Sequence, residues 1–169
     1  MIKILNIGCG ENKEISFLNL NEECEQVNVD VRPEVSPDII CDARVLPFED
    51  SSFDIIYSSH TLEHFGRNEI FKTLKEWYRV LKKDGEFWII VPDIKWAAKR
   101  ILKENLENPR VMIEEDKVLS VLYGDQTYEL NAHKTGFTRD TLYRELELLG
   151  LKRIEGIIEG YNIVLHGIK

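Results

Sequence analysis

Short apolar runs alternate with polar and amphipathic stretches along the first half of the chain. We interpret the apolar runs as strands, because they are brief, rich in isoleucine and valine, and mostly end at a glycine, a proline or an acid. The predicted strands are Ile2–Ile7, Gln26–Val29, Ile39–Cys41, Phe53–Tyr57 and Glu86–Val91.

Helical periodicity is clearest between Asn68 and Leu81, where apolar side chains recur at three- and four-residue steps. Lys82–Gly85 would end this helix, with cations in its last turn and a turn dipeptide. The segment Gly124–Gly136 is polar and aromatic and is predicted to be an ordered loop. Further helices are predicted over Asn12–Leu20, Asp93–Asn108, Val111–Tyr123 and Thr138–Leu149, with Asn12 and Thr138 as caps and Gly150 as a stop.

The tail contains two strand-like runs, Leu151–Ile158 and Tyr161–Ile168, joined by a Glu-Gly pair that is typical of a hairpin. This order predicts an α/β fold, Rossmann-like and three-layered, whose sheet is parallel except at its end. The links around the third strand are too short for covering helices. We therefore expect one thinly covered sheet face, which a second subunit would cover in a homodimer.

Length and charge narrow the class of protein. The 169 residues predict a single domain, 1–169, and the net charge of −8 argues against a dedicated nucleic-acid binder. No apolar run is long enough to span a membrane, and the first strand leaves no room for a signal peptide. Cys9, Cys24 and Cys41 form no C-x-x-C pair, which predicts reduced thiols in a cytoplasmic protein.

The residues that follow each predicted strand carry the candidate chemistry, because open α/β sheets bind ligands at the carboxyl ends of their strands. Gly8 and Gly10 permit a tight turn close to a ligand, with amides aimed from a helix N-terminus at a carboxylate or phosphate. Asp30 follows Gly10 by 20 residues, the usual spacing for an acid that binds ribose hydroxyls. Asp42 could accept a hydrogen bond from an adenine amine. Each feature alone is common in turns, but the ordered set indicates an adenosine-type ligand.

Several stretches together resemble the class I S-adenosylmethionine-dependent methyltransferases, and most closely the type 11 domain related to ubiquinone biosynthesis. The resemblance covers about residues 2–93, and 136–168 fit the last helix and strands of that family. It implies a seven-stranded sheet with an antiparallel final strand, and S-adenosyl-L-methionine as cofactor. The stretches that carry it are Leu5–Gly10, Asn28–Asp30, Cys41–Phe53, Asp54–Phe65 and Glu76–Asp93.

The resemblance also implies roles for individual residues. The glycine turn would contact the methionine part of the cofactor, Asp30 the ribose, Asp42 and the Ala43 amide the adenine, and Ser59 the sulfonium region beside His60. Two departures stand out: Asn12 replaces the usual third glycine, and no helices precede Ile2. The implied cofactor-binding residues are Gly8, Cys9, Gly10, Asp30, Val31, Asp42, Ala43, Ser59 and His60.

The acceptor side is less constrained. His60, His64 and His133 are candidate bases, because imidazole titrates near neutral pH, and His60 is the best placed. His60 could instead orient the cofactor through its backbone, and His133 could be a solvated loop residue. We expect 93–136 to be a substrate-covering insertion. The acceptor is predicted to be a small molecule, because Ser58–Thr61 stand where amine methyltransferases carry N-P-P-Y. A basic helix face at Lys95, Lys99, Arg100 and Lys103 is either solvated or contacts an anionic acceptor.

Three alternatives stay open. His60-Thr61-Leu62-Glu63-His64 matches the H-x-x-E-H signature of zinc peptidases, but it follows a buried strand and lacks an evident third ligand, so no metal site is expected. An NAD-dependent oxidoreductase shares the glycine turn and ribose acid but needs the missing third glycine. A binding module without catalysis would retain the cofactor residues alone.

Overall fold

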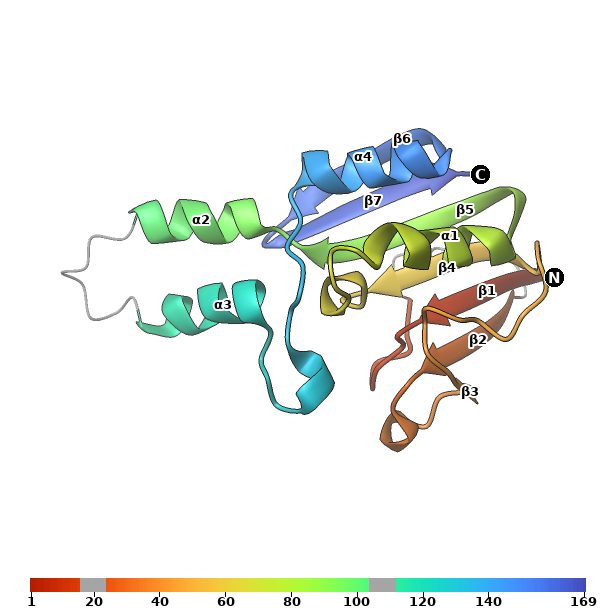
Figure 1. Cartoon of the computed structure of the whole chain (residues 1–169), viewed down its shortest axis with the longest axis horizontal. Coiled ribbons are helices and arrows are strands. Elements are labelled where there is room, and N and C mark those ends of the chain that lie inside the picture. The colour runs from red at the N-terminus through yellow and green to blue at the C-terminus, as the bar shows by residue number, and fades with distance from the viewer. Residues whose placement is uncertain (16–23, 104–111) are drawn as a thin grey trace.

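The computed structural model describes residues 1–15, 24–103 and 112–169. Its centre is a seven-stranded sheet with the order β3-β2-β1-β4-β5-β7-β6 (Figure 1). Strands β1 to β5 pair in parallel, whereas β7 is antiparallel to both of its neighbours. The predicted α/β sheet with an antiparallel end is therefore confirmed. The strands are β1 (Ile2–Ile7), β2 (Cys24–Asp30), β3 (Ile39–Ile40), β4 (Phe53–Ser59), β5 (Leu81–Pro92), β6 (Lys152–Glu159) and β7 (Asn162–Ile168).

Two helices, α1 (Ile70–Val80) and α4 (Arg139–Leu149), cover one face of this sheet (Figure 1). Their apolar stripes pack on alternate strand residues, and Trp77 of α1 stacks on Phe87 of β5 with ring centroids 6.3 Å apart. The predicted cap of α4 is confirmed: the Thr141 amide donates to the Thr138 hydroxyl, and Gly150 closes the helix at φ 98°. Burial of this face is the main stabilising term of the fold.

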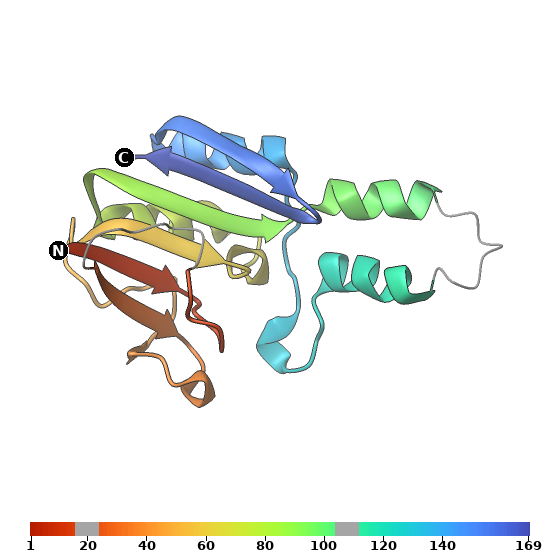
Figure 2. The same cartoon turned by 180° about the vertical axis from the view of Figure 1, so that it is seen from behind.

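The opposite face holds a smaller apolar cluster, in which Ile4, Ile55 and Tyr57 pack with Ile15. Figure 2 shows this face, over which no helix of the described residues lies. The helix predicted over Asn12–Leu20 is wrong for residues 12–15, and its remainder lies outside the described residues. There the Asn12 side chain accepts a hydrogen bond from the Glu14 amide two residues on, which forms a turn instead of a helix cap. The homodimer stays a prediction.

The predicted start of the fifth strand, at Glu86, is also corrected. The helix itself is confirmed as α1, but Lys82–Gly85 belong to β5, which starts directly after α1. Leu81 pairs with Phe53, and the next residue that pairs with β4 is Glu86, opposite Ile55, so Lys82–Gly85 bulge out of this ladder. Asp84 in the bulge has φ +62°, and Lys82 forms an ion pair with Asp54 of β4 (Nζ–Oδ1 2.8 Å). The irregular register between these strands absorbs the turn.

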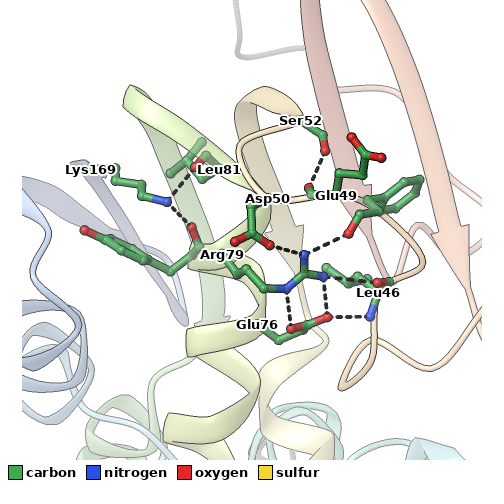
Figure 3. Close-up of polar contacts among 10 residues, drawn as sticks. Leu46, Glu49, Asp50, Ser52, Glu76, Arg79, Leu81 and Lys169 are labelled. Atoms are coloured by element: carbon green, nitrogen blue, oxygen red, sulfur yellow. Dashed lines mark hydrogen bonds and ion pairs between the residues drawn. The ribbon is translucent and has the colours of Figure 1, made fainter.

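A polar cluster fastens the carboxyl-terminal end of α1 to the segment that leads into β4 (Figure 3). Arg79 donates to the carbonyls of Leu46 and Phe48 and pairs with both Glu76 and Asp50. Glu76 in turn accepts from the Leu46 amide at 2.8 Å. The Arg79 guanidinium, followed by that amide, lowers the pKa of Glu76. Lys169 Nζ, at the chain end, donates to the Tyr78 and Leu81 carbonyls, both at 2.7 Å.

The remaining helices, α2 (Ile94–Lys103) and α3 (Met112–Tyr123), form an arm that projects beyond the carboxyl ends of the strands (Figures 1 and 2). Ala97, Val118 and Val121 form its small core, against which Tyr161 of the hairpin turn packs. The chain then returns past the strand ends through the predicted loop, which contains one 3-10 turn, Glu129–Asn131. None of the helices in the described part of the chain is long and apolar enough to span a membrane.

Candidate active site

Two cavities of about 190 and about 480 Å³ lie at the carboxyl ends of the strands. Gly8, Arg32, His60, His64 and Tyr128 line both of them, so the two form one crevice. The structure brings together every residue that the sequence predicted for the site. The smaller cavity contains Gly8, Asp30, Val31, Asp42, Ala43 and His60, and the larger contains Gly8, Cys9, Gly10, Ser59, His60 and His133.

The glycine turn after β1 requires glycine at both positions, since Gly8 has φ +68° and Gly10 has φ +58°. A Cβ atom on Gly8 would lie 2.0 Å from Thr61 Oγ1. The amides of Gly8 and Cys9 donate to the Val29 carbonyl, at 2.8 and 3.0 Å. The expectation that this turn aims its amides at a ligand from a helix N-terminus is therefore wrong for those two amides, which instead bind the turn to β2.

Asp30 ends β2 with a carboxylate that is only 6% exposed. It accepts hydrogen bonds from the Gly10 amide and the Arg32 amide, both at 2.9 Å, and from Arg32 Nε at 3.3 Å. The Arg32 guanidinium also lies 4.6 Å from the ring centroid of Tyr128, which connects β2 to the loop across the crevice. Both carboxylate oxygens keep lone-pair capacity for a pair of hydroxyl donors.

Asp42 follows β3 and is held by Arg44, whose Nη2 lies 2.6 Å from Oδ2. The Arg44 side chain lowers the pKa of Asp42, so this carboxylate is ionised at neutral pH. Next to it, the Ala43 carbonyl accepts a 2.8 Å hydrogen bond from Trp77 Nε1, so a core side chain positions this segment. The apolar lining around them suits a flat heterocycle; it consists of Val31, Cys41, Phe65 and Leu130.

His60 stands at the junction of the two cavities, directly after β4. Its φ of +52° is unusual for a residue other than glycine, and its amide donates to the Ile90 carbonyl of β5 at 2.9 Å. The side chain is 40% exposed, and its Nδ1 lies 3.3 Å from Oε1 of Glu63, which is 1% exposed. This geometry places an imidazole with one face in the crevice and one nitrogen against a buried carboxylate.

His64 and His133 meet although they are far apart in sequence, with ring centroids 5.0 Å apart. Their Nδ1 atoms lie 3.2 Å from the Ala132 carbonyl and 3.1 Å from the Val121 carbonyl, respectively. Burial lowers the pKa of His133, and nearby Glu63 only partly opposes this shift. Neutral imidazole is therefore the expected form of His133 at pH 7, and its side chain is only 10% exposed instead of solvated.

The zinc-peptidase interpretation of His60–His64 is wrong as a helix motif. His60 has left-handed backbone geometry, and the 3-10 turn begins only at Leu62, so the two histidines do not share a helix face. The site residues predicted from the sequence do not include Glu63, Arg32 or Tyr128. The only sequence signal for Glu63 is its place in the H-x-x-E-H motif. The Arg32–Tyr128 contact joins segments whose proximity nothing in the sequence indicates.

The 93–136 segment contributes one wall of the larger cavity. Lys117, Asp125 and Asn131 line it together with Tyr161 from the hairpin turn. By contrast, Lys95 and Lys99 of α2 are exposed and line neither cavity, and Arg100 lies over the Trp96 ring. The segment is placed to cover an acceptor, and that role stays a prediction.

Comparison with known proteins identifies the family. The model of a methyltransferase domain, type 11, matches residues 5–89, which is half of the chain. An uncharacterized protein of Methanocaldococcus jannaschii is 32% identical over 133 residues, covering 73% of this chain and 52% of its own length. A human protein described as probable tRNA methyltransferase 9B is 27% identical over 144 residues, covering 79% of this chain and 30% of its own length. The chain thus spans about half or less of these relatives.

Solved structures agree on the fold. An S-adenosylmethionine-dependent methyltransferase from Aquifex aeolicus superposes with a TM-score of 0.63 at 16% identity, covering 99% of this chain and 81% of that one. These matches favour methyl transfer over the oxidoreductase and the non-catalytic alternatives. The chain belongs to the class I S-adenosylmethionine-dependent methyltransferases, with S-adenosyl-L-methionine as its cofactor.

Proposed function

We propose that the enzyme transfers a methyl group from S-adenosylmethionine to a small polar acceptor held in the larger cavity. The observation that carries this proposal is the junction of the two cavities at Gly8 and His60. A cofactor with its adenosine in the smaller cavity would have its sulfonium at this junction, facing the larger one. The donor and the acceptor would then meet at this junction.

Each part of the crevice fits a part of the cofactor. Asp30 would accept hydrogen bonds from the ribose hydroxyls, while Asp42 and Ala43 would bind the adenine edge. The glycine turn with Cys9 would bound the methionine part, and Ser59 would lie near the sulfonium. The bound cofactor supplies an electrophilic methyl group for in-line displacement, so the chain's main contribution is alignment.

The charge of the larger cavity favours a small acceptor that is neutral or cationic. Glu11, Glu14 and Asp125 line it, against Arg32 and Lys117. Its volume of about 480 Å³ lies in the usual range for small-molecule sites. Together with the net charge of −8, this lining disfavours a polyanionic acceptor.

His60 is the proposed general base. Its ring reaches the crevice, and the buried Glu63 carboxylate 3.3 Å from Nδ1 would stabilise the imidazolium that forms. An acceptor O–H or N–H would pass its proton to this ring as the methyl group arrives. His133, further along the same cavity, is the second candidate.

Methylation of an RNA nucleoside is a second candidate function. The human relative is described as a probable tRNA methyltransferase, and Lys95 and Lys99 are exposed on the arm beside the crevice. In this case a single base would enter the larger cavity while the arm contacted phosphates.

Transfer of labelled methyl groups distinguishes the two candidates. The protein is incubated with methyl-labelled S-adenosylmethionine and, separately, with a small-metabolite extract and with unmodified tRNA. We expect label in the metabolite fraction and none in the tRNA, and no label anywhere with Asp30→Asn. Label that enters tRNA and is released by ribonuclease would refute the small acceptor and support the second candidate.

A further inference from the structure

Three potential metal ligands converge beside the larger cavity, which two of them line. Glu63, His64 and His133, here called the Glu63 cluster, each place one ligand atom within 4.8 Å of the others. Two of them come from the turn after β4 and the third from the loop after α3. The cofactor-binding residues do not include this cluster, so the proposed cofactor contacts leave it unexplained.

The hydrogen bonds of the two histidines fix which nitrogen is available. Each Nδ1 lies against a backbone carbonyl, Ala132 for His64 and Val121 for His133, and must therefore carry the proton. Each neutral ring then has a lone pair on Nε2. Metal-binding histidines usually show this arrangement, in which the second nitrogen donates to a carbonyl or carboxylate.

The carboxylate of Glu63 is the third potential ligand, beside the lone pairs of the two histidines. It is 1% exposed, and neither oxygen has a hydrogen-bond donor among the described residues. His133 Nε2 lies 3.9 Å from Oε1, and the His60 Nδ1 contact of 3.3 Å involves the same oxygen outside hydrogen-bond geometry. A buried carboxylate without a donor is destabilising, and a cation between it and the two lone pairs would relieve this.

The two segments are held rigidly together. The amides of Lys134 and Thr135 donate to the Glu63 carbonyl at 2.8 and 3.0 Å, and the Thr135 hydroxyl donates to the Phe65 carbonyl at 2.7 Å. The backbone around the cluster is thus fixed before any ligand binds, which reduces the entropy lost on binding.

We propose that the Glu63 cluster binds one divalent transition-metal ion of the zinc class. Two imidazoles and one carboxylate are a ligand set that Zn²⁺ accepts, with a fourth position left open. Coordination at about 2.0–2.1 Å would bring the ligand atoms to roughly 3.4 Å from one another, a contraction within reach of side-chain torsions. His64 and His133 both line the larger cavity, so the open position would face the acceptor. The sequence-based expectation of no metal is revised by this proposal.

A role for the ion rests on the proposed function. An oxygen or nitrogen of the acceptor that occupied the open position would have its pKa lowered, which would ease the loss of its proton as the methyl group arrives. The ion would thereby prepare the nucleophile in the chamber where the methyl group arrives.

Cobalt titration of the metal-free, tag-free protein tests the binding directly. We expect one Co²⁺ per chain, the intense visible bands of a four-coordinate ion, displacement by Zn²⁺, and a rise in melting temperature with Zn²⁺ excess. If the wild-type protein binds no Co²⁺, the proposal is refuted. Bands of a cobalt–thiolate bond would also refute it, because they would place the ion on a cysteine such as the exposed Cys24.

Variants locate the ion. Glu63→Gln and His133→Gln should each weaken Co²⁺ binding at least about 100-fold, since even outer contacts of metal sites contribute 10- to 100-fold. His166→Gln is the matched control, because His166 lies on β7 near Glu86 (Nε2–Oε2 3.4 Å) and not in the Glu63 cluster. This variant should bind Co²⁺ as the wild type does. Unchanged affinity in either cluster variant would refute the assignment. Label in tRNA would refute only the proposed acceptor, whereas methyl transfer to metabolites without metal binding would refute only this inference.

Discussion

The two ends of the crevice are built in different ways. At the cofactor end, the residues sit directly after β1, β2, β3 and β4, and backbone hydrogen bonds such as those from Gly8 and Cys9 to Val29 connect neighbouring strands. At the acceptor end, Glu63 and His64 meet His133 from a loop that the arm supports. In the proposed function, the sheet would fix cofactor geometry, whereas the 93–136 segment would fix the acceptor. Substitutions in the insertion should change the acceptor site and leave cofactor binding intact.

The largest effect is expected at the glycine turn. Gly8→Ala would force a Cβ onto Thr61 at φ +68°, whereas Gly160→Ala places a Cβ at φ +61° with nothing within 4 Å. We expect unfolding free energy to fall by roughly 3 kcal/mol for Gly8→Ala and by about 1 kcal/mol for Gly160→Ala, measured by urea denaturation. Equal losses for the two variants would contradict the close packing of β1 against the Thr61 segment.

Trp77→Phe tests whether the core positions Ala43, which is proposed to bind adenine together with Asp42. It removes the bond to the Ala43 carbonyl and some buried volume, so we expect a loss of about 2 kcal/mol in stability and weaker binding of S-adenosylhomocysteine. Phe87→Leu is the control, because Phe87 is fully buried beside Trp77 but has no hydrogen-bonding group that could hold the Ala43 carbonyl. Calorimetry should show lower affinity for Trp77→Phe alone.

The polar cluster of Arg79 with Glu76 and Asp50 should make the free energy of unfolding depend on pH in the acidic range. The pKa of Glu76 is below its ordinary 4.5, so its stabilisation is present above that pH and is lost as pH falls through the lower folded-state value. Glu76→Gln should lower unfolding free energy by about 1 kcal/mol at pH 7 and by less in acid. Denaturation curves recorded across this pH range provide the measurement.

Asp50→Asn is the matched control for that series. Its side chain is 78% exposed, although it pairs with the same Arg79 at 2.8 Å, so its loss should change stability only slightly at any pH. A larger effect for Asp50 than for Glu76 would show that the cluster is not organised around the Leu46 amide.

The smallest effect is expected where the loop closes on β2. Tyr128→Ala removes the stacking of Arg32 on the aromatic ring, an interaction of about 0.5–1 kcal/mol. Hydrogen exchange within 124–136 should accelerate by about 2- to 5-fold. Tyr128→Phe retains the ring and should exchange as the wild type does. If the alanine variant exchanged at the wild-type rate, this contact would not hold the loop.

The cofactor end could be predicted from the sequence because it depends on local signals. Gly8, Asp30, Asp42 and His60 each follow a short apolar run, and parallel strands bring their carboxyl ends to one edge of the sheet. The start of β5 could not be placed from the sequence, because Lys82–Gly85 combine a turn signal with an extended backbone. Leu81 and Glu86 pair with β4 on either side of a bulge that contains these four residues.

The acceptor end could not be predicted in the same way. His64 is held by the Ala132 carbonyl and His133 by the Val121 carbonyl, so that the two rings lie close together. Nothing in the periodicity of either segment indicates that the rings meet. Glu63 belongs to an H-x-x-E-H motif that binds metal on a helix, whereas here His60, directly after β4, has left-handed backbone geometry. Long-range contacts between loops lack the regular pattern that makes strands and helices visible in a sequence.

Calorimetric titration with S-adenosylhomocysteine tests most directly whether the strand ends form the cofactor site. The wild-type protein should bind one molecule per chain, and Asp30→Asn should bind at least about 100-fold more weakly, because it loses the charge that holds the ribose hydroxyls. Asp38→Asn is the control, because Asp38 accepts hydrogen bonds from Asn28 and lines neither cavity. The folded Asp38→Asn variant should bind S-adenosylhomocysteine with wild-type affinity. Wild-type affinity in Asp30→Asn would contradict the account.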